Sequence, residues 1–345
     1  MTHEAVTALV VHPGKVPDLD DLCARITARC TELGLPPLLV LETSVEDPGL
    51  GQARSAVAQG ATLVMAAGGD GTVRAVAQAM TGTGVPMAVL PQGTGNLLAR
   101  NLDIPVDPVQ ALDAALGGTT RRIDVGRLVE GTDALDGPGS DGAASDGPGE
   151  GMVFTIMAGA GFDAAMMREA PEGLKDAVGW PAYLIGGIRG LRRRKVRVEL
   201  TLDGGEIRRA TVRTVLIGNV GQLQGGLELL PDALPDDGLL DVALVAPKRF
   251  HDWVILVVRG LTRRHRRDAR LKTYQAREVR VRMDGRHPRQ VDGDLIADGV
   301  HLVARIEPGA LLMKVPTPDG APATDDGAQS AGDAVPVAPV PHGAP

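Results

Sequence analysis

The chain has 345 residues, only 2% of them aromatic, and a formal net charge of −7 at pH 7. Residues 130–150 and 316–345 hold ten acids and no Lys or Arg, so the remainder of the chain carries a charge of +3. The length suffices for two domains, whereas the apolar run 253–258 is far shorter than the ~20 residues that cross a bilayer, and two cysteines exclude a disulfide framework.

The first third of the chain alternates apolar runs with segments of helical periodicity. Strands are predicted at 6–11, 38–41 and 63–67, and helices at 19–33 and 50–58. This order predicts a parallel sheet with right-handed crossovers and with ligand-binding residues at the carboxyl ends of its strands. Thr43 follows the second strand, where a threonine fits either a ligand contact or a helix cap.

A glycine turn interrupts the pattern where the third strand ends. Its five residues are Gly68, Gly69, Asp70, Gly71 and Thr72, and a helical pattern begins directly after them. Glycines leave backbone N–H groups uncovered, and the start of a helix favours an anion. Asp70 can approach a metal or a hydroxyl, and Thr72 can donate to a phosphate oxygen. The turn is therefore predicted to bind phosphate.

The same arrangement recurs one element later. An apolar strand at 85–90 leads into a turn that contains Gly93, Thr94 and Asn96, and a helix follows. Two matched turns on neighbouring strands predict a site for polyphosphate, and the alternative is a pair of tight turns without a ligand. A P-loop is excluded, because its last glycine is followed by Lys and Ser or Thr, whereas Gly71 is followed by Thr72 and a valine.

Strand-like runs follow one another after a helix predicted at 109–116, which is typical of an antiparallel β-sandwich. They lie at 120–129, 152–158, 196–202, 206–217, 239–245, 279–283 and 300–306. We therefore expect an α/β domain at 1–122, a β-sandwich domain at 123–307 and a strand at 308–315 that returns to the first domain. The Gly, Asp, Ala and Pro bias of 131–151 and 316–345 predicts a disordered loop and a disordered tail.

Together these motifs resemble the diacylglycerol kinase catalytic family, which includes bacterial lipid kinases and sphingosine kinases. The two glycine turns carry the resemblance in the first domain, and segments 158–163, 231–241 and 291–294 carry it in the second. NAD kinases share only the first turn. The resemblance covers about residues 5–315. It implies a nucleotide-binding α/β domain with a β-sandwich, and an ATP- and Mg²⁺-dependent kinase that converts diacylglycerol or a similar lipid to phosphatidic acid or the matching lipid phosphate.

The resemblance also implies roles for single residues. Asp294 stands where the family has a glutamate that acts as general base, so its carboxylate is one methylene shorter, and Asp292 is its neighbour or substitute. Asp70 is expected to bind a catalytic Mg²⁺. Thr43 and the two glycine turns are expected to bind ATP. A second metal site is implied at Asp237 with the backbone carbonyls of Leu234 and Leu239. Without the resemblance, residues 236–238 fit a simple β-turn.

Two basic clusters, 192–195 and 259–270, each adjoin an apolar segment and predict peripheral contact with an anionic membrane surface. Nucleic acid is not an expected partner, because aromatic residues that stack on bases are nearly absent. The expected partners are ATP, a diacylglycerol-like lipid and the membrane, and a homodimer is left open.

The start of the sequence lacks a signal-peptide pattern, so a cytoplasmic protein is expected. Two alternatives are a kinase of the same fold acting on another lipid or polyol alcohol, such as a sphingoid base, and a non-catalytic lipid or nucleotide sensor.

Overall fold

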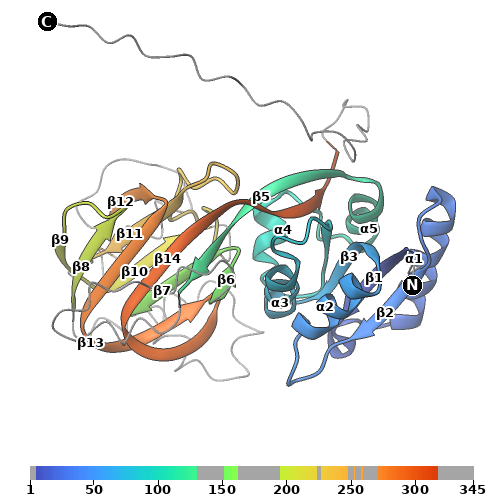
Figure 1. Cartoon of the computed structure of the whole chain (residues 1–345), viewed down its shortest axis with the longest axis horizontal. Helices are drawn as coiled ribbons and strands as arrows, with labels where there is room; N and C mark the ends of the chain where they lie inside the picture. Colours follow the sequence, from blue (N-terminus) through green and yellow to red (C-terminus); the bar gives the residue numbers. More distant parts are fainter. Residues whose placement is uncertain are drawn as a thin grey trace, which may run out of the picture.

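The computed structural model describes residues 5–129, 151–161, 195–223, 227–247, 252, 258 and 271–317. Figure 1 shows two bodies side by side, one with helices around a central sheet and one built from strands. The predicted α/β and β-sandwich domains are therefore confirmed. The basic residues at 192–194 and 259–270, the tail from 318 and the predicted loop up to 150 lie outside the described residues.

The first body is a parallel sheet with the order β4-β3-β1-β2. Its elements are β1 (Val6–Val11), η1 (Pro13–Lys15), α1 (Leu19–Leu33), β2 (Leu38–Glu42), α2 (Leu50–Ala58), β3 (Ala61–Gly68), α3 (Asp70–Met80), β4 (Met87–Pro91), α4 (Leu97–Asn101) and α5 (Pro108–Gly117). Side chains of α1 and α5 pack on one face of the sheet, and those of α2 and α3 pack on the other. Because both faces are covered, the central strands β3 and β4 are apolar and almost wholly buried.

The second body is made of antiparallel strands. They are β5 (Thr119–Leu128), β6 (Met152–Phe154), β7 (Met157–Gly161), β8 (Val196–Leu202), β9 (Arg208–Val212), β10 (Thr214–Gly218), β11 (Leu240–Val245), β12 (Leu271–Ala276), β13 (Glu278–Val291) and β14 (Asp294–Val315). Alternate residues of β8 and β13 point into a core that includes Leu200, Val281 and Leu302.

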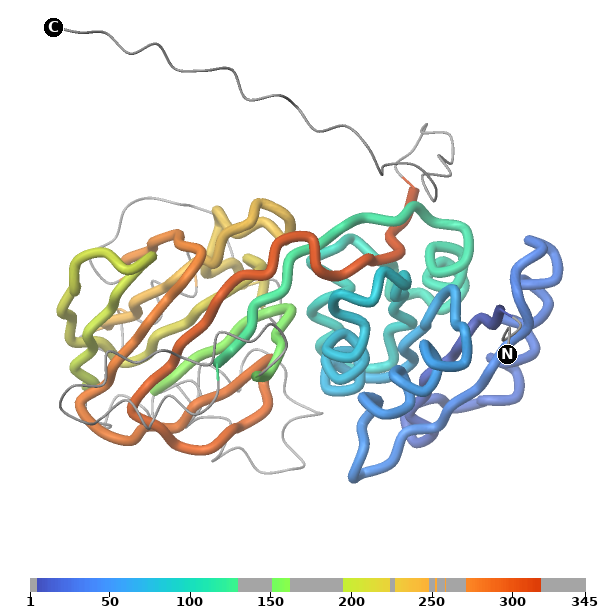
Figure 2. Tube along the Cα trace, viewed as in Figure 1, coloured from blue at the N-terminus to red at the C-terminus, as the bar shows by residue number. Residues whose placement is uncertain are grey.

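Two long strands connect the bodies. Figure 2 shows β14 leaving the second body and running into the first beside β5. The sequence predicted separate strands at 300–306 and 308–315, but β14 is continuous from 294 to 315, with a shift in register between Glu307 and Leu311. At its end Met313 pairs with Met87 of β4, parallel to that strand. The order of the strands therefore runs unbroken from one body to the other.

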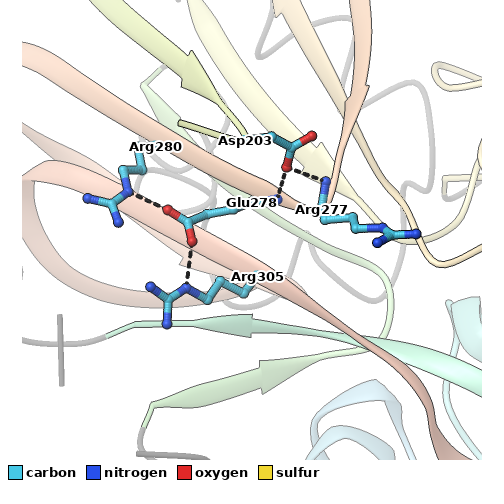
Figure 3. A network of polar contacts seen from close by, with 5 residues as sticks. All are labelled: Asp203, Arg277, Glu278, Arg280 and Arg305. Carbon is cyan, nitrogen blue, oxygen red and sulfur yellow. Dashed lines mark hydrogen bonds and ion pairs between the residues drawn. The ribbon is translucent and has the colours of Figure 1, made fainter. Parts of the chain in front are cut away.

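An ion-pair network links three segments of the second body. In Figure 3, Glu278 at the start of β13 lies between Arg280 and Arg305, and Asp203 accepts hydrogen bonds from the backbone N–H groups of Arg277 and Glu278 at 2.9 and 2.8 Å. Burial alone would raise the pKa of Glu278, but the two arginines outweigh it and lower that pKa. The network joins the turn after β8 to β13 and β14.

Candidate functional site

The two glycine turns meet at the carboxyl edge of the parallel sheet. Strands β3 and β4 end level with each other, because Gly68 pairs with Pro91 and the Gln92 N–H donates to the Gly68 carbonyl at 3.1 Å. A Cβ atom at Gly93 would lie 2.9 Å from the Cα atom of Gly69, closer than such atoms normally approach. Only glycine therefore allows the two backbones to lie this close together.

Asp70 links the two turns. It is the first residue of α3, and its Oδ1 accepts a hydrogen bond of 2.7 Å from the backbone N–H of Leu97, the first residue of α4. Burial raises the pKa of Asp70, against backbone hydrogen bonds from Leu97 and Asn96 and the charge of Arg100, which lower it. Asp70 thus has a structural contact that the sequence analysis did not anticipate.

The predicted nucleotide-binding residues of the second turn differ in their exposure. The Asn96 side chain holds the turn closed, because its Oδ1 accepts from the Gly93 N–H at 2.9 Å and its Nδ2 donates to the Gly93 carbonyl at 2.7 Å. Asn96 also has a left-handed backbone, with φ of 47°. Thr94 is exposed, whereas Thr72 of the first turn is buried. Asn96 therefore shapes the turn, and Thr94 faces solvent.

Among the polar side-chain atoms that are buried without a hydrogen-bond partner within the described part of the chain, two follow directly after strands of the parallel sheet. They are Thr43 Oγ1, just after β2, and His12 Nδ1, just after β1. Leaving a buried polar atom unpaired costs about 1–3 kcal/mol, so such atoms are suited to a ligand. Thr43 was predicted here from the sequence. His12 was not, and its signal is its place at the carboxyl end of a strand, like that of Thr43.

Asp294 of the second body lies against the first turn. Its Oδ2 is 2.6 Å from Nη2 of Arg74 in α3 and 3.9 Å from the position that a Cβ atom at Gly71 would take. The Asp294 side chain is 53% exposed, so the carboxylate can still be approached. A core of residues from both bodies, including Val73, Leu98, Ile156 and Leu230, packs between them and fixes this arrangement. Asp294 was predicted at the site from the sequence, whereas Arg74 was not.

Asp292 has a different environment from Asp294. Its Oδ1 accepts from the N–H groups of Ile156 and Met157 at 3.0 and 2.8 Å, and its Oδ2 accepts from the N–H and the hydroxyl of Thr155 at 2.8 and 3.2 Å. Burial raises the pKa of Asp292 to about 6, against these backbone hydrogen bonds and the charge of Arg74. Both carboxylate oxygens are therefore engaged inside the protein.

The acids around Asp237 form a separate cluster. Asp237 Oδ1 accepts from the Leu239 N–H at 2.9 Å, while Asp236 pairs with Arg121 at 2.6 Å. Buried Asp124 accepts from the N–H groups of Gly238 and Gly309, both at 2.7 Å. Burial raises the pKa of Asp237 despite the Leu239 hydrogen bond, and the charges of Asp124 and Asp236 raise it further.

These acids do not make a metal site by their side chains alone. Across the described ranges, no three His, Cys, Asp or Glu side chains are grouped so that they could hold a metal ion. A cation at Asp237 would therefore need backbone oxygens, as was expected from the sequence for Leu234 and Leu239.

Among the described residues, no helix is long and apolar enough to cross a membrane.

An α/β domain with two glycine turns at its carboxyl edge is joined to a β-sandwich, and comparison with known families assigns both domains to a class of two-domain kinases. Residues 17–128 match the diacylglycerol kinase catalytic domain, and residues 156–315 match the YegS C-terminal NAD kinase beta sandwich-like domain. The chain belongs to the diacylglycerol kinase family of lipid kinases, with a second domain of the YegS type. The resemblance drawn from the sequence is thereby confirmed.

Two curated relatives illustrate the relationship. A Pseudomonas aeruginosa protein named "Probable lipid kinase YegS-like" is 33% identical over 69% of this chain and 71% of its own length. A diacylglycerol kinase of Mycobacterium tuberculosis is 33% identical over 55% of this chain. With three of the curated relatives, including the mycobacterial enzyme, the chain matches only 57–60% of their length.

A solved structure supports the fold. The crystal structure of a diacylglycerol kinase from Bacillus anthracis superposes with a TM-score of 0.65 at 16% sequence identity, covering 91% of this chain and 98% of the other. At that identity the match supports the fold of both domains.

Proposed function

We propose that this chain is an ATP-dependent lipid kinase that transfers the γ-phosphoryl group to the free hydroxyl of diacylglycerol or a similar lipid. The observation that carries this proposal is the position of Asp294, which brings an accessible carboxylate of the second domain to the glycine turn of the first. Phosphoryl transfer requires mainly that donor, acceptor and charge be positioned together. The names of the curated relatives support a lipid as acceptor.

The ATP phosphates are assigned to the edge where the two turns meet. Gly68, Gly69, Gly71 and Thr72 would surround them from the first turn, and Gly93 and Thr94 from the second, with Asn96 holding the second turn in shape. The close backbone contact and the start of α3 favour an anion here. Thr43 Oγ1, which is buried and unpaired among the described residues, is a contact for the rest of the nucleotide.

Asp294 is assigned as the general base. It would orient the acceptor hydroxyl and take its proton while the hydroxyl oxygen attacks the γ-phosphorus. Asp292 is assigned a positioning role, because its engaged oxygens fix the turn that precedes β14. Asp70 would hold the second turn and face the phosphates.

Mg²⁺ is the cation that this chemistry requires, since it neutralises phosphate charge and orients the transferred group. Asp70 would hold it near the phosphates. A second cation is assigned to Asp237 with the carbonyls of Leu234 and Leu239. Its fit rests on the grouping of Asp124, Asp236 and Asp237: burial raises the pKa of Asp237, the charges of the other two acids raise it further, and a cation would offset that repulsion.

The substrate places the reaction at a membrane surface. We assign the enzyme to the cytoplasmic side, in peripheral contact with anionic lipid, where the basic clusters outside the described residues would act.

The test of the proposed function is incubation of the full chain with labelled ATP, Mg²⁺ and vesicles containing diacylglycerol, followed by extraction of the lipid. Labelled phosphatidic acid is the expected product. A different labelled lipid would move the acceptor to another alcohol, and binding without any product would indicate a sensor.

A further inference from the structure

Arg74 stands between the glycine turn and the two acids of the second domain. It lies one helical turn after Asp70 in α3, and its guanidinium contacts Asp294 at 2.6 Å. Its charge also lowers the pKa of Asp292, against the larger effect of burial. The Arg74 side chain is only 13% exposed, and its Nε is buried without a hydrogen-bond partner among the residues the structure describes. The ion pair with Asp294 therefore uses only part of its donor capacity.

The guanidinium also lies beside the place assigned to phosphate. The Asp294 oxygen that it contacts is 3.9 Å from the position of a Cβ atom at Gly71, so guanidinium, carboxylate and glycine turn meet at one point. A phosphate group bound at the start of α3 would lie next to the Asp294 carboxylate. That juxtaposition is unfavourable unless a cation separates the two negative groups.

Few other described cations are near the turns. Arg100 is one, since its Nε donates to the Gly95 carbonyl at 2.9 Å and its charge lowers the pKa of Asp70, but its side chain is exposed. Arg74 is much less exposed to solvent, so its charge is less screened and acts more strongly on a neighbouring anion. A planar guanidinium can also donate to a carboxylate and a phosphate through different N–H groups.

We propose that Arg74 binds the Asp294 carboxylate in the nucleotide-free protein and the γ-phosphoryl group of ATP during transfer. This inference rests on the proposed function. When Arg74 turns to the phosphate, the Asp294 oxygen becomes available to the acceptor hydroxyl. The hydroxyl oxygen then forms a bond to the γ-phosphorus, the bond from that phosphorus to the bridging oxygen breaks, and ADP leaves. The hydroxyl proton passes to Asp294, and Arg74 remains charged throughout.

The first test compares ATP with ADP. Binding of each nucleotide to the full chain is measured by calorimetry with Mg²⁺ and without lipid, for wild type, Arg74→Ala and Arg74→Lys. Arg54→Ala, which removes an exposed arginine of α2, is the matched control. Arg74→Ala should weaken ATP binding by about 10-fold and ADP binding by less than about 2-fold, because only ATP has the γ-phosphate. Arg74→Lys should recover part of the loss, and Arg54→Ala should match wild type.

The second test removes the charge of Asp294, which competes with the γ-phosphate for Arg74. Asp294→Asn should tighten ATP binding by about 3-fold without affecting ADP, because Arg74 no longer has to leave a carboxylate. The gain should vanish in the double variant Arg74→Ala with Asp294→Asn. The thermal midpoint of each variant, measured by circular dichroism, shows that it is folded. Equal changes for ATP and ADP, or no change, would overturn the role of Arg74.

The rate of transfer separates this inference from the function on which it rests. Arg74→Ala should lower kcat by about 10²- to 10³-fold, the usual cost of losing a donor that stabilises transition-state charge. If wild type phosphorylates no lipid while Arg74→Ala still loses its preference for ATP, the proposed acceptor is wrong and the role of Arg74 stands. If wild type binds neither nucleotide, both proposals are wrong.

Discussion

The carboxylate of Asp70 accepts a 2.7 Å hydrogen bond from the backbone N–H of Leu97, and so joins the start of α3 to the start of α4. The contact leaves no room for a side chain at Gly95, where a Cβ atom would lie 2.5 Å from Asp70 Oδ2. One carboxylate thus sets the spacing of the two turns, and in the proposed function the same carboxylate faces the ATP phosphates.

Two substitutions of Asp70 should separate these roles. Asp70→Asn keeps an oxygen that can accept from Leu97 and should have nearly the wild-type unfolding free energy, but should lose at least about 100-fold in transfer rate because the charge is gone. Asp70→Ala should lose the same activity and also about 1 kcal/mol or more of unfolding free energy, since the Leu97 N–H loses its partner. Urea unfolding and a kinase assay measure both. Near-normal activity in either variant would remove Asp70 from the site.

The contact between the two turns predicts that Gly93→Ala is damaging. The new methyl group would lie 2.9 Å from the Gly69 Cα atom. Because that atom belongs to the backbone, it cannot easily move away to remove the clash. We expect a loss of about 1–3 kcal/mol in unfolding free energy and weaker ATP binding. Gly117→Ala, in α5 with nothing within 4 Å of the added atom, is the control and should be neutral or stabilising. Equal behaviour of the two variants would contradict the close contact.

The environment of Asp292 predicts a pH-dependent stability. Its pKa is about 6 in the folded protein and 3.8 ordinarily, so the folded state binds the proton more tightly. The raised pKa of Asp292 contributes about 3 kcal/mol to the unfolding free energy. This contribution is fully present below pH 3.8 and is lost as the pH rises through 6. The stability advantage of wild type over Asp292→Asn should therefore narrow from pH 4 to pH 7 in urea unfolding. A widening advantage would mean that the N–H donors of residues 155–157 dominate over burial.

The cluster around Asp237 predicts stabilisation by Mg²⁺. A cation that binds only the folded state raises the unfolding midpoint by mass action. Mg²⁺ should raise the thermal midpoint of wild type and should raise that of Asp237→Ala much less. Asp113→Ala removes an exposed acid of α5 and serves as the control, with a wild-type response. If Asp237→Ala responds to Mg²⁺ as wild type does, the second cation is not at this position.

The local patterns of the first domain were readable from the sequence, because an apolar run followed by a glycine turn and a helix is determined by neighbouring residues. The strand, turn and helix around Gly68 and around Gly93 follow from that local sequence pattern. The second domain was readable as a class, since alternating short strands indicate a sandwich.

Contacts that depend on distant pairing could not be read in the same way. The continuity of β14 follows from its pairing with β5 and β13, which no local pattern specifies. Arg74 and Asp294 are 220 residues apart in the sequence. A single arginine in a predicted helix is usually a solvated side chain, and only the packing of the second domain against the helix reveals its contact. The different environments of Asp292 and Asp294, two residues apart, likewise arise from the strands around them.

The most direct measurement of the central claim is the transfer of labelled phosphate from ATP to extracted lipid by wild type and by variants of Asp294. Wild type should yield labelled phosphatidic acid from diacylglycerol vesicles, Asp294→Asn should lower the rate by about 10²- to 10⁴-fold as a general base is lost, and Asp294→Glu should retain activity. Unchanged transfer by Asp294→Asn, or no labelled lipid from wild type with any acceptor, would contradict the account.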